Sequence, residues 1–122
     1  MLDTLYDRLG GAPIIDATVD RFYEKILADD LVSGFFTNIN IDRQRQMLKA
    51  FLSMSFGGPD AYKGRDMRSV HRRAVEAGIG DKHFDRVLSL LATSLKEQGV
   101  TDEMIDEAAI ITEKLRHDIL GR

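Results

Sequence analysis

The chain has 122 residues, of which 43% are hydrophobic and 30% are charged, and its formal net charge is -3. This is the size and composition of one soluble globular domain spanning residues 1–122, and the negative charge argues against a nucleic-acid-binding protein, which needs a clustered basic face. With no cysteine, no basic start followed by an apolar run, and no apolar stretch approaching about 20 residues, we expect a cytoplasmic protein without disulfides, secretory signal or membrane span.

The first part of the chain predicts two helices. A short helix is expected over about residues 2–9, and Gly10-Gly11 ends it. Pro13 suits the first turn of a longer helix, which Asp29-Asp30 ends. Its core-facing stripe, at helical spacing, consists of Ile15, Val19, Phe22, Tyr23, Ile26 and Leu27.

A turn of helix over residues 31–36 leads to a third helix, for which Asn40 is the predicted N-cap. This helix runs to Phe56, and Gly57-Gly58-Pro59 terminates it. One side carries Gln44, Leu48, Phe51, Leu52 and Ser55. The next segment, 59–80, is the least regular part of the chain, with a single short helical piece that contains His71. Irregular backbone on a rigid scaffold often carries a functional site.

Two further helices complete the chain. Asp81 is predicted to cap a long helix that Gly99 closes, with an inner stripe of Phe84, Val87, Leu88, Leu91 and Leu95. Thr101 is predicted to cap a last helix that is continuous through Ile105, Ala108, Thr112, Leu115 and Ile119. Because no segment alternates as a strand would, the predicted fold class is all-α with four substantial helices.

Most kinds of catalytic or metal site are excluded by spacing. A di-iron bundle needs Glu-x-x-His pairs, and no histidine here has a Glu three residues before it. The zinc motif His-Glu-x-x-His is absent, and no serine lies in a glycine elbow. Gly57-Gly58-Pro59 follows a helix rather than a strand, so it is a helix stop and not a phosphate loop.

The remaining candidates are one histidine and one tyrosine. His71 has Met67 and Val70 on its inward side, and nearby arginines (Arg65, Arg68, Arg72 and Arg73) could meet carboxylates of a cofactor. A neutral imidazole can bind haem iron, and a hydroxyl such as that of Tyr23 can steady a bound diatomic ligand. The alternatives at this point are an ordinary half-buried histidine and a core tyrosine with a backbone partner. We expect His83 to be structural and His117 to be exposed.

The order of several short motifs is similar to that of a known family. They are Leu5-Tyr6-Asp7-Arg8-Leu9-Gly10-Gly11, Phe22-Tyr23-Glu24-Lys25, Phe35-Phe36 with Asn38, Gln44-Arg45, Lys49-Ala50-Phe51-Leu52, Phe56-Gly57-Gly58-Pro59, Gly64-Arg65-Asp66-Met67-Arg68, His71, His83-Phe84-Asp85 and Asp118-Ile119-Leu120. Each motif is weak alone, but their order and separations are specific. The chain resembles the truncated haemoglobins of the first group over essentially its whole length.

The resemblance implies a two-over-two helical sandwich around haem. It implies His71 as the proximal iron ligand, Tyr23 as the distal donor and Gln44 as its companion, with Phe22 and Phe36 as wall aromatics. Further wall residues would be Phe51, Tyr62, Met67, Leu88 and Ile119, and the candidate partners of the haem propionates are Arg43, Tyr62 and Arg65.

Three positions depart from patterns found in some relatives. Met47 stands where a distal histidine can bind iron, so we expect a vacant or water-filled sixth site in the resting protein. Leu48 stands where many relatives have a second glutamine, leaving Tyr23 and Gln44 as the distal donors. Leu115 matches the position of a histidine that attaches haem covalently in a subset of the family. His117 is two residues away, or about 200° of helix rotation, so we expect one non-covalent haem b per chain.

Three functions follow as hypotheses. The first is reversible binding of O₂, CO and NO at ferrous haem, for oxygen transport or storage. The second is nitric-oxide dioxygenation in the same pocket, which would need a reductase as partner. The third, from a different class, is a haem-free helical interaction or sensor domain that has kept the fold.

Overall fold

The computed structural model describes residues 4–57 and 67–122, and every regular element in these two ranges is helical. The elements in chain order are α1 (Leu5–Leu9), α2 (Ala12–Ala28), the 3₁₀ helix η1 (Ser33–Phe36), α3 (Ile41–Ser55), α4 (Met67–Val70), α5 (Arg72–Glu76), α6 (Asp81–Glu97), α7 (Asp102–Glu113) and α8 (Arg116–Ile119). The predicted all-α class is confirmed.

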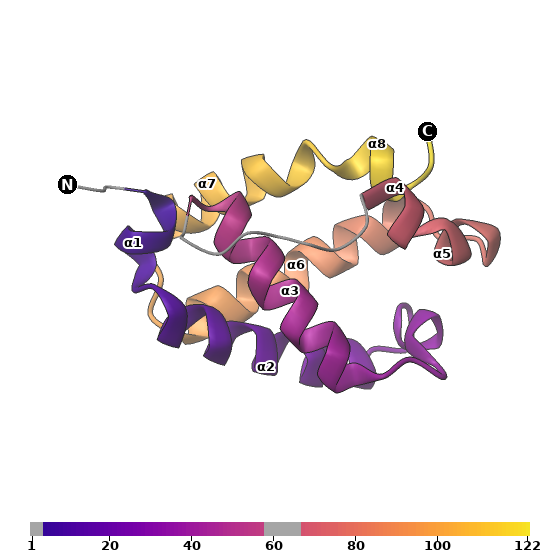
Figure 1. Cartoon of the computed structure of the whole chain (residues 1–122), viewed down its shortest axis with the longest axis horizontal. Coiled ribbons are helices and arrows are strands. Elements are labelled where there is room, and N and C mark those ends of the chain that lie inside the picture. The colour runs from indigo at the N-terminus through magenta and orange to yellow at the C-terminus, as the bar shows by residue number, and fades with distance from the viewer. Residues whose placement is uncertain (1–3, 58–66) are drawn as a thin grey trace.

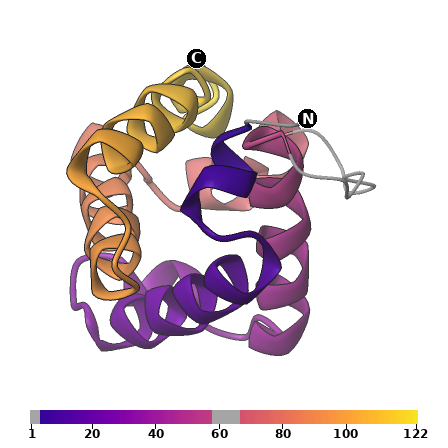
Figure 2. The same ribbon diagram turned by 90° about the vertical axis from the view of Figure 1, so that its left-hand side faces the viewer.

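The four long helices form two layers. Helix α2 packs against both α3 and α6, and α6 packs in turn against α7. In the end view of Figure 2, α2, α3, α6 and α7 make the four sides of a square, with α1 in front of it. The short helices α4 and α5 lie at the far end in Figure 1, next to α8. This is the two-over-two sandwich that was predicted.

Several helix ends follow the local chemistry predicted from the sequence. The Asn40 side chain accepts a hydrogen bond from the Arg43 amide at 3.1 Å, and the Thr101 hydroxyl accepts one from the Met104 amide at 3.3 Å. Gly57 follows α3 with φ of +89°, a conformation that suits a residue without a side chain. A Cβ at this position would lie 2.9 Å from Thr4, so α1 and the end of α3 approach closely.

The N-terminus of α6 differs from the prediction. The N-cap is Gly80 rather than Asp81, which is the first helical residue. The cap works through His83, whose Nδ1 accepts a hydrogen bond from the Gly80 amide at 2.9 Å. Its ring also makes an edge contact with Phe35 at 5.0 Å between centroids. The structural role expected for His83 is therefore what the fold shows.

The last predicted helix is broken in two. Helix α7 ends at Glu113, and α8 begins at Arg116. Between them the Leu115 amide donates to the Thr112 carbonyl at 3.0 Å, a tighter i→i−3 bond that interrupts the α-helical pattern. The prediction of one continuous helix through residue 119 was therefore wrong. His71 likewise lies between two short helices, α4 and α5, rather than inside one helical piece.

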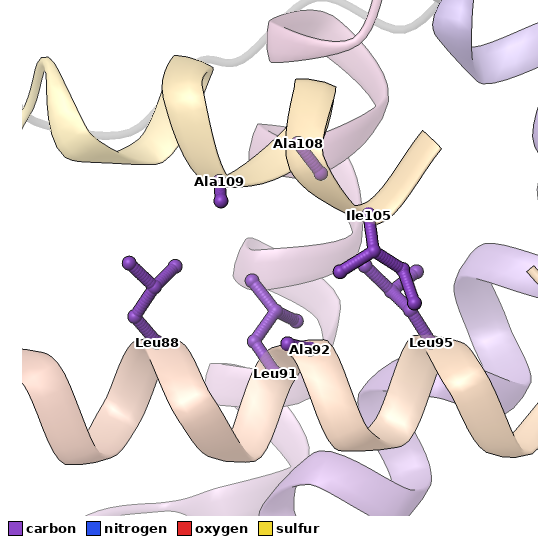
Figure 3. Close-up of a pocket in the computed structure, with 7 residues that line it drawn as sticks. All are labelled: Leu88, Leu91, Ala92, Leu95, Ile105, Ala108 and Ala109. Atoms are coloured by element: carbon purple, nitrogen blue, oxygen red, sulfur yellow. The ribbon is translucent and has the colours of Figure 1, made fainter. Parts of the chain in front are cut away.

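The core sits where the predicted stripes meet. Ile15, Val19 and Ile26 of α2 are at most 1% exposed, as is Leu95 of α6, whereas Leu27 is 46% exposed and lies outside the core. Figure 3 shows the contact of α6 with α7, where Ala92, Ala108 and Ala109 allow close approach around an apolar void of about 10 Å³. No helix of the described ranges has the length and apolar character needed to cross a bilayer.

Candidate functional site

A cavity of about 800 Å³ lies between the two helical layers. Its volume is within the usual range for small-molecule and cofactor sites. It brings together most of the predicted site residues, from five helices, η1 and the α4–α5 junction: Phe22, Tyr23, Phe36, Gln44, Met47, Leu48, Phe51, Met67, His71, Leu88 and Ile119. Residues far apart in the chain thus share one pocket with a largely apolar wall.

His71 enters this cavity from the junction of α4 and α5. Its Nδ1 lies 2.8 Å from the carbonyl oxygen of Met67. Because a carbonyl only accepts, Nδ1 must carry the proton of the neutral ring, and Nε2 keeps its lone pair. Burial lowers the pKa of His71, and the backbone hydrogen bond to Met67 opposes this more weakly. A neutral imidazole with a fixed tautomer and a free Nε2 lone pair is the form that could bind a metal ion.

Tyr23 enters the same cavity from α2. It is 4% exposed, and its ring makes edge contacts with Phe22 (5.1 Å between centroids) and with Phe36 (6.0 Å). Burial raises the pKa of Tyr23 to about 12, while the positive charge of Arg45 lowers it to a smaller extent. The hydroxyl is therefore protonated at neutral pH and can donate a hydrogen bond into the cavity.

Helix α3 presents the opposite wall. Gln44, Met47, Leu48 and Phe51 line the cavity and are each half-buried. Gln44 is one amide on an otherwise apolar stretch of this wall, in the same cavity as the Tyr23 hydroxyl. Two neutral hydrogen-bonding groups within an apolar space are suited to recognising a small polar ligand.

The residues predicted to pair with the haem propionates do not all line the cavity. Arg43 is exposed and does not line the cavity, because α3 turns its position toward solvent. Tyr62 and Arg65 lie outside the described residues. Arg72 and Arg73 do line the cavity, and within residues 4–57 and 67–122 neither makes an ion pair. From the sequence these two arginines were identified only as members of a basic cluster; their position directly after His71 is the signal that could have singled them out.

Other residues that line the cavity were not predicted as site residues, because nothing in the sequence distinguishes them from ordinary core residues. Leu52, Ser55, Phe84, Val87, Leu91 and Thr112 had been assigned to inward faces only, whereas Phe35 belongs to the short η1 and Val32, Ile39 and Ile79 lie in connections. An inward stripe predicts burial, but the packing angle of the layers decides which members touch a cavity and which touch a neighbouring helix.

The donor set fits haem rather than a metal ion bound by protein alone. In the part of the chain that is described, no group of three or more His, Cys, Asp or Glu residues is placed to hold a metal ion. His117 is exposed and away from the cavity, so His71 is the one histidine among the described lining residues. A single imidazole, apolar walls and two arginines that form no ion pair within the described ranges would together suit an apolar macrocycle that takes one imidazole ligand and carries anionic substituents.

Comparison with known proteins gives the same answer. The family model described as bacterial-like globin matches residues 4–121. The group 1 truncated hemoglobin of Synechocystis is 42% identical over 99% of this chain and all of its own length, and that of Tetrahymena pyriformis is 43% identical over 98% and 96%.

Solved structures agree with this assignment. The 2/2 hemoglobin of Synechococcus, described in the cyanomet state with covalently attached heme, superposes with a TM-score of 0.92 at 42% identity, covering 98% of this chain and 99% of that one. The Fe(III) form of the truncated hemoglobin from Tetrahymena pyriformis gives 0.92 at 42% identity, over 98% and 100%. The chain therefore belongs to the bacterial-like globins and, among these haem proteins, to the group 1 truncated haemoglobins.

Proposed function

We propose that this protein binds O₂, CO and NO reversibly at one ferrous haem b per chain, through His71. The observation that carries the proposal is the pairing of His71, whose Nδ1 donates to the Met67 carbonyl, with the buried Tyr23 hydroxyl in one cavity. When bound, haem supplies an iron with an open coordination position for a diatomic ligand. The chain's own residues decide how that ligand is held.

Each distal side chain has a defined task in this proposal. Tyr23 donates a hydrogen bond to the outer atom of the ligand, and its ring is kept in place by Phe22 and Phe36. Gln44 supports the tyrosine or the ligand from α3. Met47 and Leu48 contribute apolar side chains to the cavity wall, and Met47 offers no imidazole that would compete for the sixth position, which is vacant or water-filled in the resting protein of this proposal.

The remaining contacts support a non-covalent cofactor. Leu115 and Ile119 line the cavity with apolar side chains, whereas His117 is exposed. Because α7 and α8 are separate helices, His117 points away from the cavity as a result of the turn at Leu115 and not of rotation along one continuous helix. Arg72 and Arg73, at the cavity wall, are proposed as propionate partners; Tyr62 and Arg65 remain proposals of the same kind.

Absorption spectra of the purified, haem-supplemented protein test the proposal. We expect a Soret band that shifts on reduction, on adding CO and, reversibly, on adding O₂. His71→Ala should lose the pigment or change the spectrum of every form, whereas His117→Ala, which removes an exposed histidine, should not. An unaltered spectrum in His71→Ala would reject His71 as the ligand. A wild-type protein that takes up no haem would favour the haem-free interaction domain instead.

A turnover assay separates ligand binding from nitric-oxide dioxygenation. Nitric-oxide dioxygenation leaves the iron ferric after each turnover, so it would need a cytoplasmic reductase as partner, whereas reversible O₂ binding leaves the iron ferrous. For reversible binding we expect one equivalent of NO to be oxidised by the oxygenated protein, without sustained consumption. Continuous NO consumption with a reductant would make dioxygenation the function.

A further inference from the structure

A network of charged side chains joins α4, α6, α7 and α8 at one end of the molecule. We call it the Arg116 clamp, and its members are Arg68, Asp81, Asp85, Glu113, Arg116, Asp118 and Arg122. Figure 1 shows α4 lying against α8 at this end. These residues approach one another from distant parts of the chain, and none of them has a role in the haem and ligand binding proposed above.

Arg116 is the centre of the clamp. Its guanidinium donates to Asp81 at 3.0 Å, to Asp85 at 2.6 Å and to both carboxylate oxygens of Glu113. It also lies over the ring of Phe84, 4.4 Å from the centroid, and its side chain is only 18% exposed. An isolated surface ion pair stabilises a protein little, because holding two long side chains in one geometry costs conformational entropy. The planar guanidinium of Arg116 loses that entropy once but interacts with three carboxylates and one aromatic ring, so each further contact costs less.

Two further arginines extend the network to the segment before His71. Arg122 donates to both oxygens of Asp81 at 2.9 Å. Arg68, on α4, donates to Asp118 at 3.1 Å and to the carbonyl of Arg122 at 2.8 Å. The residue before Arg68 is Met67, whose carbonyl accepts the hydrogen bond from His71. The backbone that orients the imidazole is therefore fastened to α8.

The clamp also holds part of the cavity wall. Phe84, beneath the Arg116 guanidinium, lines the cavity, as do Leu115 and Ile119 on either side of the clamped turn. A bound macrocycle can leave only when a wall moves, and short end helices such as α4 and α8 have few internal hydrogen bonds to keep them in place. The ion pairs and hydrogen bonds between the side chains of these helices would then set how often the cavity wall opens.

We propose that the Arg116 clamp retains haem by holding α8 and the α4–His71 segment closed on the cavity, with Arg116 as the positioning residue. The inference rests on the proposed attachment of haem through His71. It concerns the rate of cofactor loss and not ligand affinity, because the clamp lies away from Tyr23 and Gln44, on other helices. Another bidentate pair, Arg8 with Glu107 at 2.7 and 2.8 Å, joins α1 to α7 and does not line the cavity.

Haem transfer from the loaded, full-length protein to an excess of apomyoglobin tests the proposal. In Arg116→Gln the transfer should be faster by about tenfold, since one side chain serves several pairs and a cation–π contact. Arg116→Lys, which keeps the charge without the fork, should fall in between. Arg8→Gln should transfer haem at the wild-type rate, and the salt dependence of transfer should be weaker in Arg116→Gln than in wild type.

The controls separate retention from general stability. The urea midpoints of Arg116→Gln and Arg8→Gln are measured together with spectra that report whether His71 still binds iron. Transfer at the wild-type rate in Arg116→Gln, or equal acceleration in Arg8→Gln, would overturn the proposal. Should Arg116→Gln fail to fold, Arg122→Gln is tested in its place: faster haem transfer is expected, and transfer at the wild-type rate would overturn the proposal. A wild-type protein without pigment would reject the function itself, which is a different result.

Discussion

Tyr23→Phe is the substitution that probes the distal site most directly. It removes one hydroxyl and leaves the ring, whose edge contacts with Phe22 and Phe36 hold it in place. Tyr23 is 4% exposed, and burial raises its pKa to about 12, so the wild-type group is a protonated donor throughout the neutral range. The change therefore isolates one hydrogen bond and leaves packing nearly intact.

The size of the effect follows from the kind of acceptor. Coordinated O₂ is charge-polarised, and a hydrogen bond to a charged acceptor contributes about 1.5–3 kcal/mol. Because about 1.4 kcal/mol corresponds to a factor of ten, Tyr23→Phe should raise the O₂ dissociation rate by about 10- to 150-fold. CO accepts hydrogen bonds poorly, so its dissociation rate should change by much less.

Stopped-flow displacement measures both rates on one sample, with CO replacing O₂ and NO replacing CO. Tyr6→Phe is the matched control, because Tyr6 is 8% exposed on α1 and does not line the cavity. It should leave both rates unchanged. An equal factor on O₂ and CO in Tyr23→Phe would show that the substitution acts on access to the cavity, and the donor role would then be refuted.

Three further predictions concern the fold and the proximal ligand. Gly57→Ala should cost about 1–3 kcal/mol in the free energy of unfolding, from positive φ and the approach to Thr4; a urea titration that finds less than about 0.5 kcal/mol would contradict it. Leu95→Ala, at a site 1% exposed, should cost about 2–5 kcal/mol, and an unchanged urea midpoint would mean that the site is not core. Burial lowers the pKa of His71, so its contribution to stability is complete above the unfolded value of about 6.5 and is lost as the pH falls through the folded value. The urea midpoint of the haem-free protein should therefore drop more on acidification in wild type than in His71→Gln, and parallel pH profiles would show that His71 is not buried as described.

The helices themselves could be predicted from the sequence because their signals are local. The stripe of α2 repeats every three to four residues, and Asn40 and Thr101 are caps whose partners lie three residues away. His71 and Tyr23 could be singled out for the same reason: each stands in a short context of apolar neighbours. Burial of Tyr23 and the neutral, hydrogen-bonded state of His71 agree with that reading.

The tertiary structure alone decides which side chains line the cavity and which ion pairs form, because both depend on residues that are distant in the chain. Arg43 is exposed, and Arg72 and Arg73 line the cavity, because the crossing of the layers sets which side of a helix meets the pocket. The break before Arg116 brings this residue to Asp81 and Asp85, which lie 35 and 31 positions earlier in the chain. Periodicity determines which residues turn inward within one helix, whereas the partner that each meets depends on contacts that form only when all the helices pack together.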